Sequence, residues 1–487
     1  MSRTRIAMET TGDAALDDIL GGGIPTQSVV IVAGEPGAGK TVVTLQMMFA
    51  AARRGKRALY FTTLAEPALK VMRYLQQFEF FDADLMEREI VLGDLGKFVR
   101  EGPAVVLAEI EARVASHEPS FVVVDSFKVI ADLLRPVPDG RAMIYDLAVQ
   151  MAGWGATTLL VGEYARADIG VGPEFGIADG ILRLGSARHE LTSVRELEVL
   201  KMRGAAHKTG THFFDITASG AAFFPRVGAP APAQHVRADA SSAPARTGIA
   251  GLDELLHGGL PRQGTTLVQG GTGTGKTLIA LHFLLEGASR GERGVLFTLE
   301  ETPEQIRAVA RGLGWDLEAA ESDGSITIRY SSPVELSTDR YLYEARNEVA
   351  ALGATRAVFD SLTTMALGVP SERRFKEMVY AITKHLRALG VTSVMTHETP
   401  QLLGNAQLTG DGVSFVADNV ILLRYVELAG RLERALSVLK ARGIKHDSEL
   451  RAFTIDTGGV EVVPGRFADM FGVLTGIPEK RNGRDRS

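Results

Sequence analysis

Residues 34–41 of the chain are Gly34-Glu35-Pro36-Gly37-Ala38-Gly39-Lys40-Thr41, and residues 270–277 are Gly270-Gly271-Thr272-Gly273-Thr274-Gly275-Lys276-Thr277. Both stretches fit the G-x-x-x-x-G-K-[ST] pattern of a phosphate-binding loop. Each follows an apolar run typical of a buried strand, at residues 28–32 and 265–268, and each precedes the apolar periodicity of a helix. Two loops in the same strand–loop–helix context are too specific for coincidence, so the sequence predicts two nucleotide-binding domains.

The residue types in these loops suit a nucleoside triphosphate with its magnesium ion. Glycines allow backbone N–H groups to wrap around the phosphates, the lysine reaches the β- and γ-phosphates, and the threonine hydroxyl binds Mg²⁺. A glycine-rich turn without a ligand is the alternative, and the duplication argues against it. We therefore expect ATP and Mg²⁺ as cofactors. The loop residues expected to bind them are Gly34, Glu35, Pro36, Gly37, Ala38, Gly39, Lys40 and Thr41, and Gly271, Thr272, Gly273, Thr274, Gly275, Lys276 and Thr277.

The two loops belong to an internal repeat. Lys40 and Lys276 are 236 positions apart, and the same offset carries Thr11-Gly12 onto Thr247-Gly248. Such self-similarity predicts a duplicated domain. Between the copies, the sequence is dominated by alanine, proline and serine, which is typical of a semi-extended linker. The expected organisation is a first domain at 1–225, a linker at 226–246, a second domain at 247–464 and a tail at 465–487.

The composition narrows the classes of protein that need consideration. Of 487 residues, 45% are hydrophobic and 23% are charged, which is ordinary for a globular protein with several domain cores. The chain has no cysteine, which excludes disulfides, thiolate metal sites and cysteine nucleophiles. Its net charge of −6 provides no general attraction for nucleic acid. The polar start of the chain and the absence of a membrane-length apolar run lead us to expect a cytoplasmic protein without a membrane partner.

Short β-branched runs alternate with helical patterns through most of each copy, which predicts an α/β domain with a mostly parallel sheet flanked by helices. The end of each copy differs, because strands follow one another there without intervening helices. This pattern predicts an antiparallel extension at one edge of each sheet. The strands expected in these extensions are residues 181–184, 196–202 and 213–216 in the first copy, and 420–424, 434–440 and 451–455 in the second.

Both copies contain an apolar strand that ends in aspartate. Asp125 lies 85 positions after Lys40, and Asp360 lies 84 positions after Lys276. An aspartate at a strand end is by itself more often a turn residue. Beside a phosphate-binding loop it predicts the carboxylate on the Mg²⁺ side of the site. The expected metal ligands are therefore Thr41, Asp125, Thr277 and Asp360.

The copies diverge at the strand that follows the helix after the phosphate-binding loop. The second copy has Glu300 and Glu301 at that strand's carboxyl end, whereas the same register places Leu64 and Ala65 there in the first copy. Paired carboxylates facing the phosphates can orient or deprotonate an attacking water or hydroxyl. The alternative is that the glutamates cap the following helix, since carboxylates stabilise helix N-termini.

A group of cationic residues lies late in each copy. Lysine and arginine two positions apart on a strand point to the same face, where they can bind an anion or reach the phosphates of a neighbouring subunit. A solvated basic stripe accounts for them equally well. These residues are Lys201, Arg203 and His207 in the first copy, and Lys440, Arg442 and His446 in the second.

Taken together, the duplicated loops, the Thr-Gly lead-in, the Glu300-Glu301-Thr302-Pro303 stretch and the Lys-x-Arg-Gly-x-x-His endings resemble the KaiC family, a duplicated branch of the RecA-like ATPases. The resemblance covers nearly the whole chain. It implies two tandem RecA-like domains and an ATP-dependent homohexameric double ring with ATP at the subunit interfaces. It also implies that Glu300 and Glu301 act as catalytic carboxylates together with Lys276, and that the two cationic groups contact the nucleotide in trans.

Two departures from the family pattern refine these expectations. The first copy lacks the glutamate pair that members of the family usually carry, so we expect it to bind ATP structurally and to hydrolyse it poorly. Clock-type members phosphorylate an adjacent Ser-Thr pair, and the matching residues here are Ser414 and Phe415. Serine/threonine autokinase activity therefore remains an expectation, with Ser414 as the acceptor candidate and Thr409 nearby.

Two other classes of function compete with the enzyme. A DNA-translocating motor needs cations on its channel loops, but residues 399–417 contain no lysine or arginine and residues 165–178 contain only Arg166. Nucleic-acid binding is therefore not expected. The other alternative is an ATP-assembled scaffold to which an unidentified signalling protein binds, and the first domain without its glutamates favours that alternative.

Overall fold

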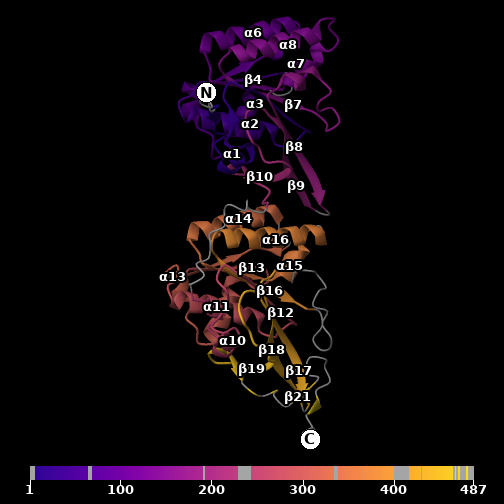
Figure 1. Ribbon diagram of the computed structural model, residues 1–487. Helices are drawn as coiled ribbons and strands as arrows, with labels where there is room; N and C mark the ends of the chain where they lie inside the picture. Colours follow the sequence, from indigo (N-terminus) through magenta and orange to yellow (C-terminus); the bar gives the residue numbers. More distant parts are fainter. Residues whose placement is uncertain are drawn as a thin grey trace, which may run out of the picture. The chain divides into compact units, whose positions relative to one another are not determined.

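The computed structural model describes residues 6–63, 68–189, 192–228, 243–333, 338–369, 371–399, 416–428 and 430–463, and in the tail residues 465, 467, 470–471 and 479–480. The chain divides into two compact units, Met1–Arg226 and Val227–Ser487 (Figure 1). Within the described ranges, no helix combines the length and apolar character that crossing a membrane requires.

The first unit is built on a nine-stranded sheet with the order β11-β10-β9-β8-β3-β7-β6-β4-β5. The strands from β8 to β5 in this order are parallel, and β9, β10 and β11 extend the sheet antiparallel from β8. The strands are β3 (Val29–Gly34), β4 (Ala58–Thr62), β5 (Ile90–Asp94), β6 (Phe121–Asp125), β7 (Thr157–Glu163), β8 (Gly180–His189), β9 (Thr192–Met202), β10 (Thr211–Thr217) and β11 (Gly220–Phe224), besides the short pair β1 (Met8–Glu9) and β2 (Ile24–Pro25). The helices are α1 (Ala14–Leu20), α2 (Lys40–Ala52), α3 (Ala68–Leu75), α4 (Ala83–Arg88), α5 (Gly96–Val99), α6 (Pro103–His117), α7 (Phe127–Leu134), α8 (Gly140–Gly153) and α9 (Pro173–Ile177).

The second unit repeats this sheet strand for strand, in the order β14-β13-β15-β16-β12-β17-β18-β19-β20. The central strand β12 again lies between two parallel neighbours, and β18, β19 and β20 form the antiparallel extension. The strands are β12 (Thr265–Gly270), β13 (Gly294–Thr298), β14 (Ile326–Tyr330), β15 (Arg356–Asp360), β16 (Thr392–Glu398), β17 (Asn419–Leu428), β18 (Arg431–Ala441), β19 (Arg451–Asp456) and β20 (Gly459–Val463), with β21 (Met470–Phe471) and β22 (Glu479–Lys480) paired in the tail. The helices are α10 (Ala250–Leu255), α11 (Lys276–Ser289), α12 (Pro303–Gly312), α13 (Leu317–Ser322), α14 (Thr338–Leu352), α15 (Leu362–Leu367) and α16 (Glu372–Ala388).

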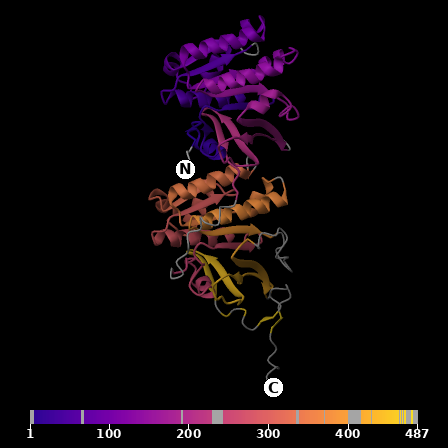
Figure 2. The same cartoon turned by 45° about the horizontal axis from the view of Figure 1, so that its top comes forward.

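Helices cover both faces of each sheet, as Figure 2 shows for the two units. In the second unit, one apolar cluster joins α10, α11, α12 and α13 to one face of the sheet, and a second cluster joins α14, α15 and α16 to the other face. The central strands are buried along their whole length, which explains why they are continuous apolar runs rather than alternating ones. The predicted fold class is confirmed: the protein contains two tandem RecA-like domains, each with a mostly parallel sheet and an antiparallel edge.

The Thr-Gly pair that recurs at the 236-residue offset, Thr11-Gly12 and Thr247-Gly248, has a structural role in both units. The Asp17 carboxylate accepts hydrogen bonds of 2.8 Å from the backbone N–H and the hydroxyl of Thr11. Asp253 accepts the same two bonds, also at 2.8 Å, from Thr247. The turn between them needs glycine, since Gly12 has φ +88° and a Cβ there would lie 2.3 Å from that of Ala50. The motif therefore closes the entry to the first helix of each unit.

Several elements escaped the sequence analysis. The outer parallel strands β5 and β14 are only partly buried, so they lack the continuous apolar signal of the central strands. The last antiparallel strands, β11 and β20, were also not predicted; each follows its neighbour after a tight turn. Lys201 and Lys440 lie on strands as expected, but Arg203 and Arg442 lie just beyond the strand ends, which corrects the expectation that lysine and arginine share one strand face.

Candidate functional site

The phosphate-binding loop of each unit lies at the carboxyl end of the central strand and leads directly into a helix, α2 or α11. Both loop lysines are buried, with 7% of Lys40 and 9% of Lys276 exposed. The Lys40 ammonium donates to the carbonyl oxygens of Gly34 and Glu35 at 2.9 and 2.8 Å, and Lys276 donates to that of Gly271 at 2.9 Å. Burial lowers the pKa of Lys40, although Glu163 and Asp125 oppose this effect.

Glycine is required by the conformation of these loops. Gly39 and Gly275 have φ values of 93° and 100°, and each immediately precedes the loop lysine. A Cβ atom at Gly39 would lie 2.8 Å from the Ile216 side chain, and one at Gly275 would lie 3.0 Å from Ile455. The loops therefore expose backbone N–H groups where a side chain would cover them.

The threonine after each lysine meets the predicted aspartate. Thr41 Oγ1 donates to Asp125 Oδ2 at 2.9 Å, and Thr277 Oγ1 donates to Asp360 Oδ2 at 2.7 Å. Burial raises the pKa of Asp360, even though Thr396 and Thr277 donate hydrogen bonds to it. Hydroxyl and carboxylate oxygens side by side form the kind of oxygen donor set that Mg²⁺ prefers.

Glu300 and Glu301 reach the same edge of the second sheet. Glu300 Oε1 accepts hydrogen bonds from Ser361 Oγ at 2.5 Å and from the hydroxyl of Thr364. Glu301 Oε2 is buried and has no hydrogen-bond partner within the described part of the chain. Burial raises the pKa of Glu301, and the charges of Asp360 and Glu300 raise it further. The unit thus holds one carboxylate in place and leaves an oxygen of its neighbour unpaired, beside the expected metal ligand.

Helix capping does not explain these two glutamates. The N-cap of α12 is Thr302, whose hydroxyl accepts from the Gln305 backbone N–H, while the Gln305 side chain accepts from the Thr302 N–H. This is a complete capping box, and neither Glu300 nor Glu301 contributes its carboxylate to it.

The first unit differs in its chemistry at this edge. Its counterparts of the glutamates, Leu64 and Ala65, lie outside the described residues. The position of Thr364 is occupied by Val129, which cannot hold a carboxylate by hydrogen bonding. In addition, Tyr60 OH donates to Asp125 Oδ2 at 2.9 Å, whereas the second unit uses the Thr396 hydroxyl on Asp360.

The late cationic groups do not join the site of their own unit. Lys201 pairs with Ile181 at the start of β8, and Lys440 pairs with Val420 at the start of β17, so both lie at the amino edge of the parallel strands. The ammonium of Lys440 donates to Ala417 O at 2.6 Å. Burial lowers the pKa of both lysines, and the neighbouring arginine lowers it further. His207 and His446 follow in the same loops, and His207 Nδ1 is buried without a hydrogen-bond partner among the described residues.

Two acidic residues at the sites were not singled out from the sequence. Glu398, the last residue of β16, accepts from Thr272 Oγ1 at 2.5 Å and lies 3.7 Å from the Lys276 ammonium. Glu163 ends β7 in the same way beside Lys40. Their signal in the sequence is a glutamate at equivalent strand ends in both copies. The acceptor candidates Ser414 and Thr409 lie outside the described residues.

The residues present fit ATP with Mg²⁺. The glycine-lined cradle, the buried lysine and the adjoining Thr–Asp oxygens are found in both units. The unpaired Glu301 oxygen adds, in the second unit, a polar atom that faces the same edge. Thr41 with Asp125 and Thr277 with Asp360 would hold the ion, and the loop N–H groups with Lys40 or Lys276 would hold the phosphates.

Comparison with known proteins also identifies an ATPase family for this chain. The family model of the KaiC ATPase matches the chain twice, at residues 10–227 and 245–466. The chain is 29% identical over 485 residues to the circadian clock oscillator protein KaiC of Picosynechococcus sp., covering 96% of this chain and 91% of that protein. It is 29% identical over 491 residues to the circadian clock protein KaiC3 of Synechocystis sp., covering 96% and 94% respectively. The protein is therefore a member of the KaiC family of ATPases.

Proposed function

We propose that the second domain of this KaiC-family ATPase performs Mg²⁺-dependent cleavage of ATP, whereas the first domain binds ATP mainly as a structural ligand. The observation that carries the proposal is the buried, unpaired oxygen of Glu301 beside Asp360, at the edge of the sheet where the phosphate-binding loop lies. A carboxylate with a raised pKa in that position is suited to accept a proton.

Each residue of the second site has a distinct task. Glu301 accepts the proton of the water or hydroxyl that attacks the γ-phosphorus, and the bond to the bridging oxygen breaks to leave ADP. Glu300, held by Ser361 and Thr364, keeps the attacking group in line. Lys276 exchanges its bond to the Gly271 carbonyl for the phosphate oxygens and neutralises their charge. Thr277 and Asp360 would hold Mg²⁺, whose positive charge would reduce the phosphate charge that opposes attack.

We further propose an ATP-dependent hexameric ring in which Lys201, Arg203 and His207, and Lys440, Arg442 and His446, contact the nucleotide of a neighbouring subunit. Their position at the amino edge of the parallel strands supports this role, because the phosphate-binding loop of the same unit lies at the carboxyl edge.

Autophosphorylation is the second activity we propose for the second domain. Ser414 is the acceptor candidate, and its support is the match of its sequence position to that of the acceptor pair in clock-type members. The named relatives are circadian clock proteins. For this chain we propose the more general role of a nucleotide-dependent signalling ring that binds a protein partner. An ATP-assembled scaffold without phosphoryl transfer is the alternative.

The decisive experiment follows γ-labelled ATP with Mg²⁺ on the purified protein and separates label on protein from label in free phosphate. The variants Glu300→Gln/Glu301→Gln and Ser414→Ala are measured in parallel. Label on the wild-type protein that is lost in both variants supports the autokinase. Free phosphate without labelled protein supports an ATPase and removes the kinase. If neither product exceeds that of the glutamate variant, the enzymatic proposal is wrong and the scaffold remains.

A further inference from the structure

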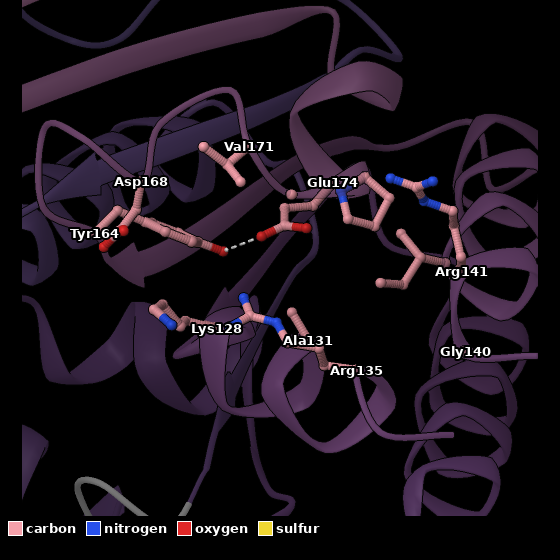
Figure 3. Close-up of a pocket in the computed structure, with 12 residues that line it drawn as sticks. Lys128, Ala131, Arg135, Gly140, Arg141, Tyr164, Asp168, Val171 and Glu174 are labelled. Carbon is pink, nitrogen blue, oxygen red and sulfur yellow. Dashed lines mark hydrogen bonds between the residues drawn. The ribbon is translucent and has the colours of Figure 1, made fainter. Parts of the chain in front are cut away.

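The first domain contains a partly open hollow of about 350 Å³ next to its nucleotide site (Figure 3). Its walls come from α7, the first turns of α8, and the segment that connects the end of β7 to α9. A volume of this size lies at the lower end of the range for small-molecule sites. The charged and hydroxyl-bearing residues that line it are Lys128, Arg135, Arg141, Tyr164, Asp168 and Glu174.

A buried carboxylate lies at the centre of this hollow. Only 2% of Glu174 is exposed, and its only side-chain partner among the described residues is the hydroxyl of Tyr164, at 3.3 Å. Figure 3 shows the two side chains pointing toward each other inside the hollow. Burial raises the pKa of Tyr164, and the Glu174 charge and hydrogen bond raise it further, so the tyrosine is a donor. A buried carboxylate with one neutral partner is costly unless a cation joins it.

None of the lysines and arginines that line the hollow forms an ion pair with Glu174 among the described residues. Lys128 is bound to Asp132 at 2.8 Å and lies over the Tyr164 ring, 5.4 Å from its centroid. Arg135 lies 3.3 Å from the same aspartate and is largely exposed. Arg141 is exposed at the α8 side of the hollow (Figure 3), and it has no ion pair or hydrogen bond with any side chain that the structure describes. The hollow therefore offers a buried carboxylate that no described cation pairs with, and a guanidinium at its exposed side that has no described ion pair.

We propose that this hollow binds a small zwitterion of the free amino acid or dipeptide class. Glu174 receives the ammonium group, and Arg141, assisted by Arg135, receives the carboxylate. The apolar atoms of Ala131, Ile144 and Pro173 line the space between the two ends.

The position of the hollow links this ligand to the first nucleotide site. The Tyr164 backbone N–H donates to Gly34 O in the phosphate-binding loop at 3.2 Å. Tyr164 also directly follows Glu163, whose negative charge raises the pKa of Lys40. Lys128 lies three residues after Asp125, the expected metal ligand. Both segments that leave the nucleotide site thus enter the wall of the hollow. Affinity for the zwitterion should therefore depend on bound nucleotide, and the reverse dependence follows by linkage.

Within the described residues of the second domain, the counterparts of Tyr164 and Lys128 differ in chemistry from those in the first. Thr399 replaces Tyr164 and makes the equivalent backbone bond to Gly270 O, at 3.1 Å. Thr363 replaces Lys128 and accepts from the Glu398 N–H instead of lining a charged hollow. Among the described residues, this pair of charges is found in the first domain. The proposed coupling between the hollow and the first nucleotide site rests on the proposed function, in which the first domain binds ATP as a structural ligand.

The experiment titrates the full chain with each of the twenty free L-amino acids and with glycylglycine, by calorimetry and thermal shift, in Mg-ATP and again without nucleotide. N-acetyl and C-terminal amide forms of every ligand that binds are measured next. We expect at least one zwitterion to bind with Kd below about 1 mM, and we expect blocking either end to weaken it tenfold or more. Glu174→Gln and Arg141→Ala should each weaken it tenfold, whereas Arg100→Ala, an exposed cation of the same domain, should not.

The outcomes separate this proposal from the proposed function. If no zwitterion of the panel binds, or if binding is unchanged in both Glu174→Gln and Arg141→Ala, the site is wrong. Equal binding of N-acetyl forms would show that Glu174 has only a structural role and would also overturn it. A Lys40→Ala variant removes nucleotide from the first site; zwitterion binding that persists there but no longer responds to ATP supports both the site and the coupling. Wild-type affinity that is the same with and without ATP overturns the coupling.

Discussion

The two domains share a fold and a phosphate-binding loop but differ in what surrounds the expected γ-phosphate position. In the second domain, Ser361 and Thr364 hold Glu300, and the adjacent Glu301 keeps an unpaired buried oxygen. In the sequence of the first domain, Leu64, Ala65 and Val129 stand at the positions of Glu300, Glu301 and Thr364, whereas Ser126 matches Ser361. Under the proposed function, this difference separates phosphate binding, for which both domains have the loop, from chemistry on the phosphate, for which only the second domain has the glutamate pair.

The largest expected effect comes from removing the second domain's carboxylates. Glu300→Gln/Glu301→Gln should lower phosphate release by about 10²–10⁴-fold, because general-base catalysis contributes that much. Phosphate release per chain is the measurement, with nucleotide content measured alongside. Glu304→Gln, an exposed glutamate of α12, is the matched control and should behave as wild type. Release at the wild-type rate in the double variant would place hydrolysis in the first domain and break the comparison.

The converse change should give activity to the first domain. In the Glu300→Gln/Glu301→Gln background, the additions Leu64→Glu, Ala65→Glu and Val129→Thr supply both the carboxylates and a hydroxyl to hold one of them. We expect phosphate release to rise about tenfold or more above that background, which is a part of the general-base contribution. Leaving out Val129→Thr should give less. No gain, with nucleotide still bound, would mean that the first domain lacks more than these residues.

A smaller effect is expected from the hydroxyl that holds Glu300. Thr364→Val copies the first domain's residue and removes one of two hydrogen bonds to that carboxylate. The loss of a hydrogen bond to a charged group, about 1.5–3 kcal/mol, predicts a fall in kcat of about tenfold or more with little change in KM. Thr383→Val, which removes a hydroxyl from α16, serves as the control. A change in KM alone would show that Thr364 acts on binding.

The smallest expected effect concerns pH and stability. His282 Nε2 accepts from the Val460 N–H at 2.8 Å, while Gln46 makes the equivalent anchor in the first domain by bonding both the N–H and the carbonyl of Ala221. Burial lowers the pKa of His282 to about 4, from 6.5. Because the unfolded state binds the proton more readily, stability from this group is complete above 6.5 and is lost as pH falls toward 4.

The variant His282→Gln places in the second domain the residue type that the first domain has at this position, Gln46. It should remove this part of the pH dependence of the unfolding free energy, which is at most about 2–3 kcal/mol. Thermal melting between pH 4 and 7.5 measures it, and His257→Gln, an exposed histidine of the same domain, is the control. If wild type and His282→Gln lose stability in parallel on acidification, another group is responsible.

Much of the fold was predictable because its signals are local. The central strands are continuous apolar runs, and the helices that follow have clear periodicity, so the parallel core and its antiparallel extension could be inferred. The outer strands β5 and β14 were missed since they are only partly buried and their pattern is weak. The break between strand and loop at Arg203 and Arg442 was also missed, because it depends on backbone bonds to Asp179 and Asp418, far away in the sequence.

The residue pattern alone predicted the duplication, the two phosphate-binding loops, their Thr–Asp partners and the absence of the glutamate pair from the first copy. Each of these is a residue type at a fixed spacing, where the chemistry of phosphate and magnesium tolerates few substitutes. The folded chain was needed to see that Glu301 has an oxygen without a partner among the described residues, that Lys201 and Lys440 lie at the opposite sheet edge from their own loop, and that Glu174 faces Tyr164 in a charged hollow. These properties depend on which distant side chains share hydrogen bonds and which are left without them, and such contacts form only when the sheet brings its strands together.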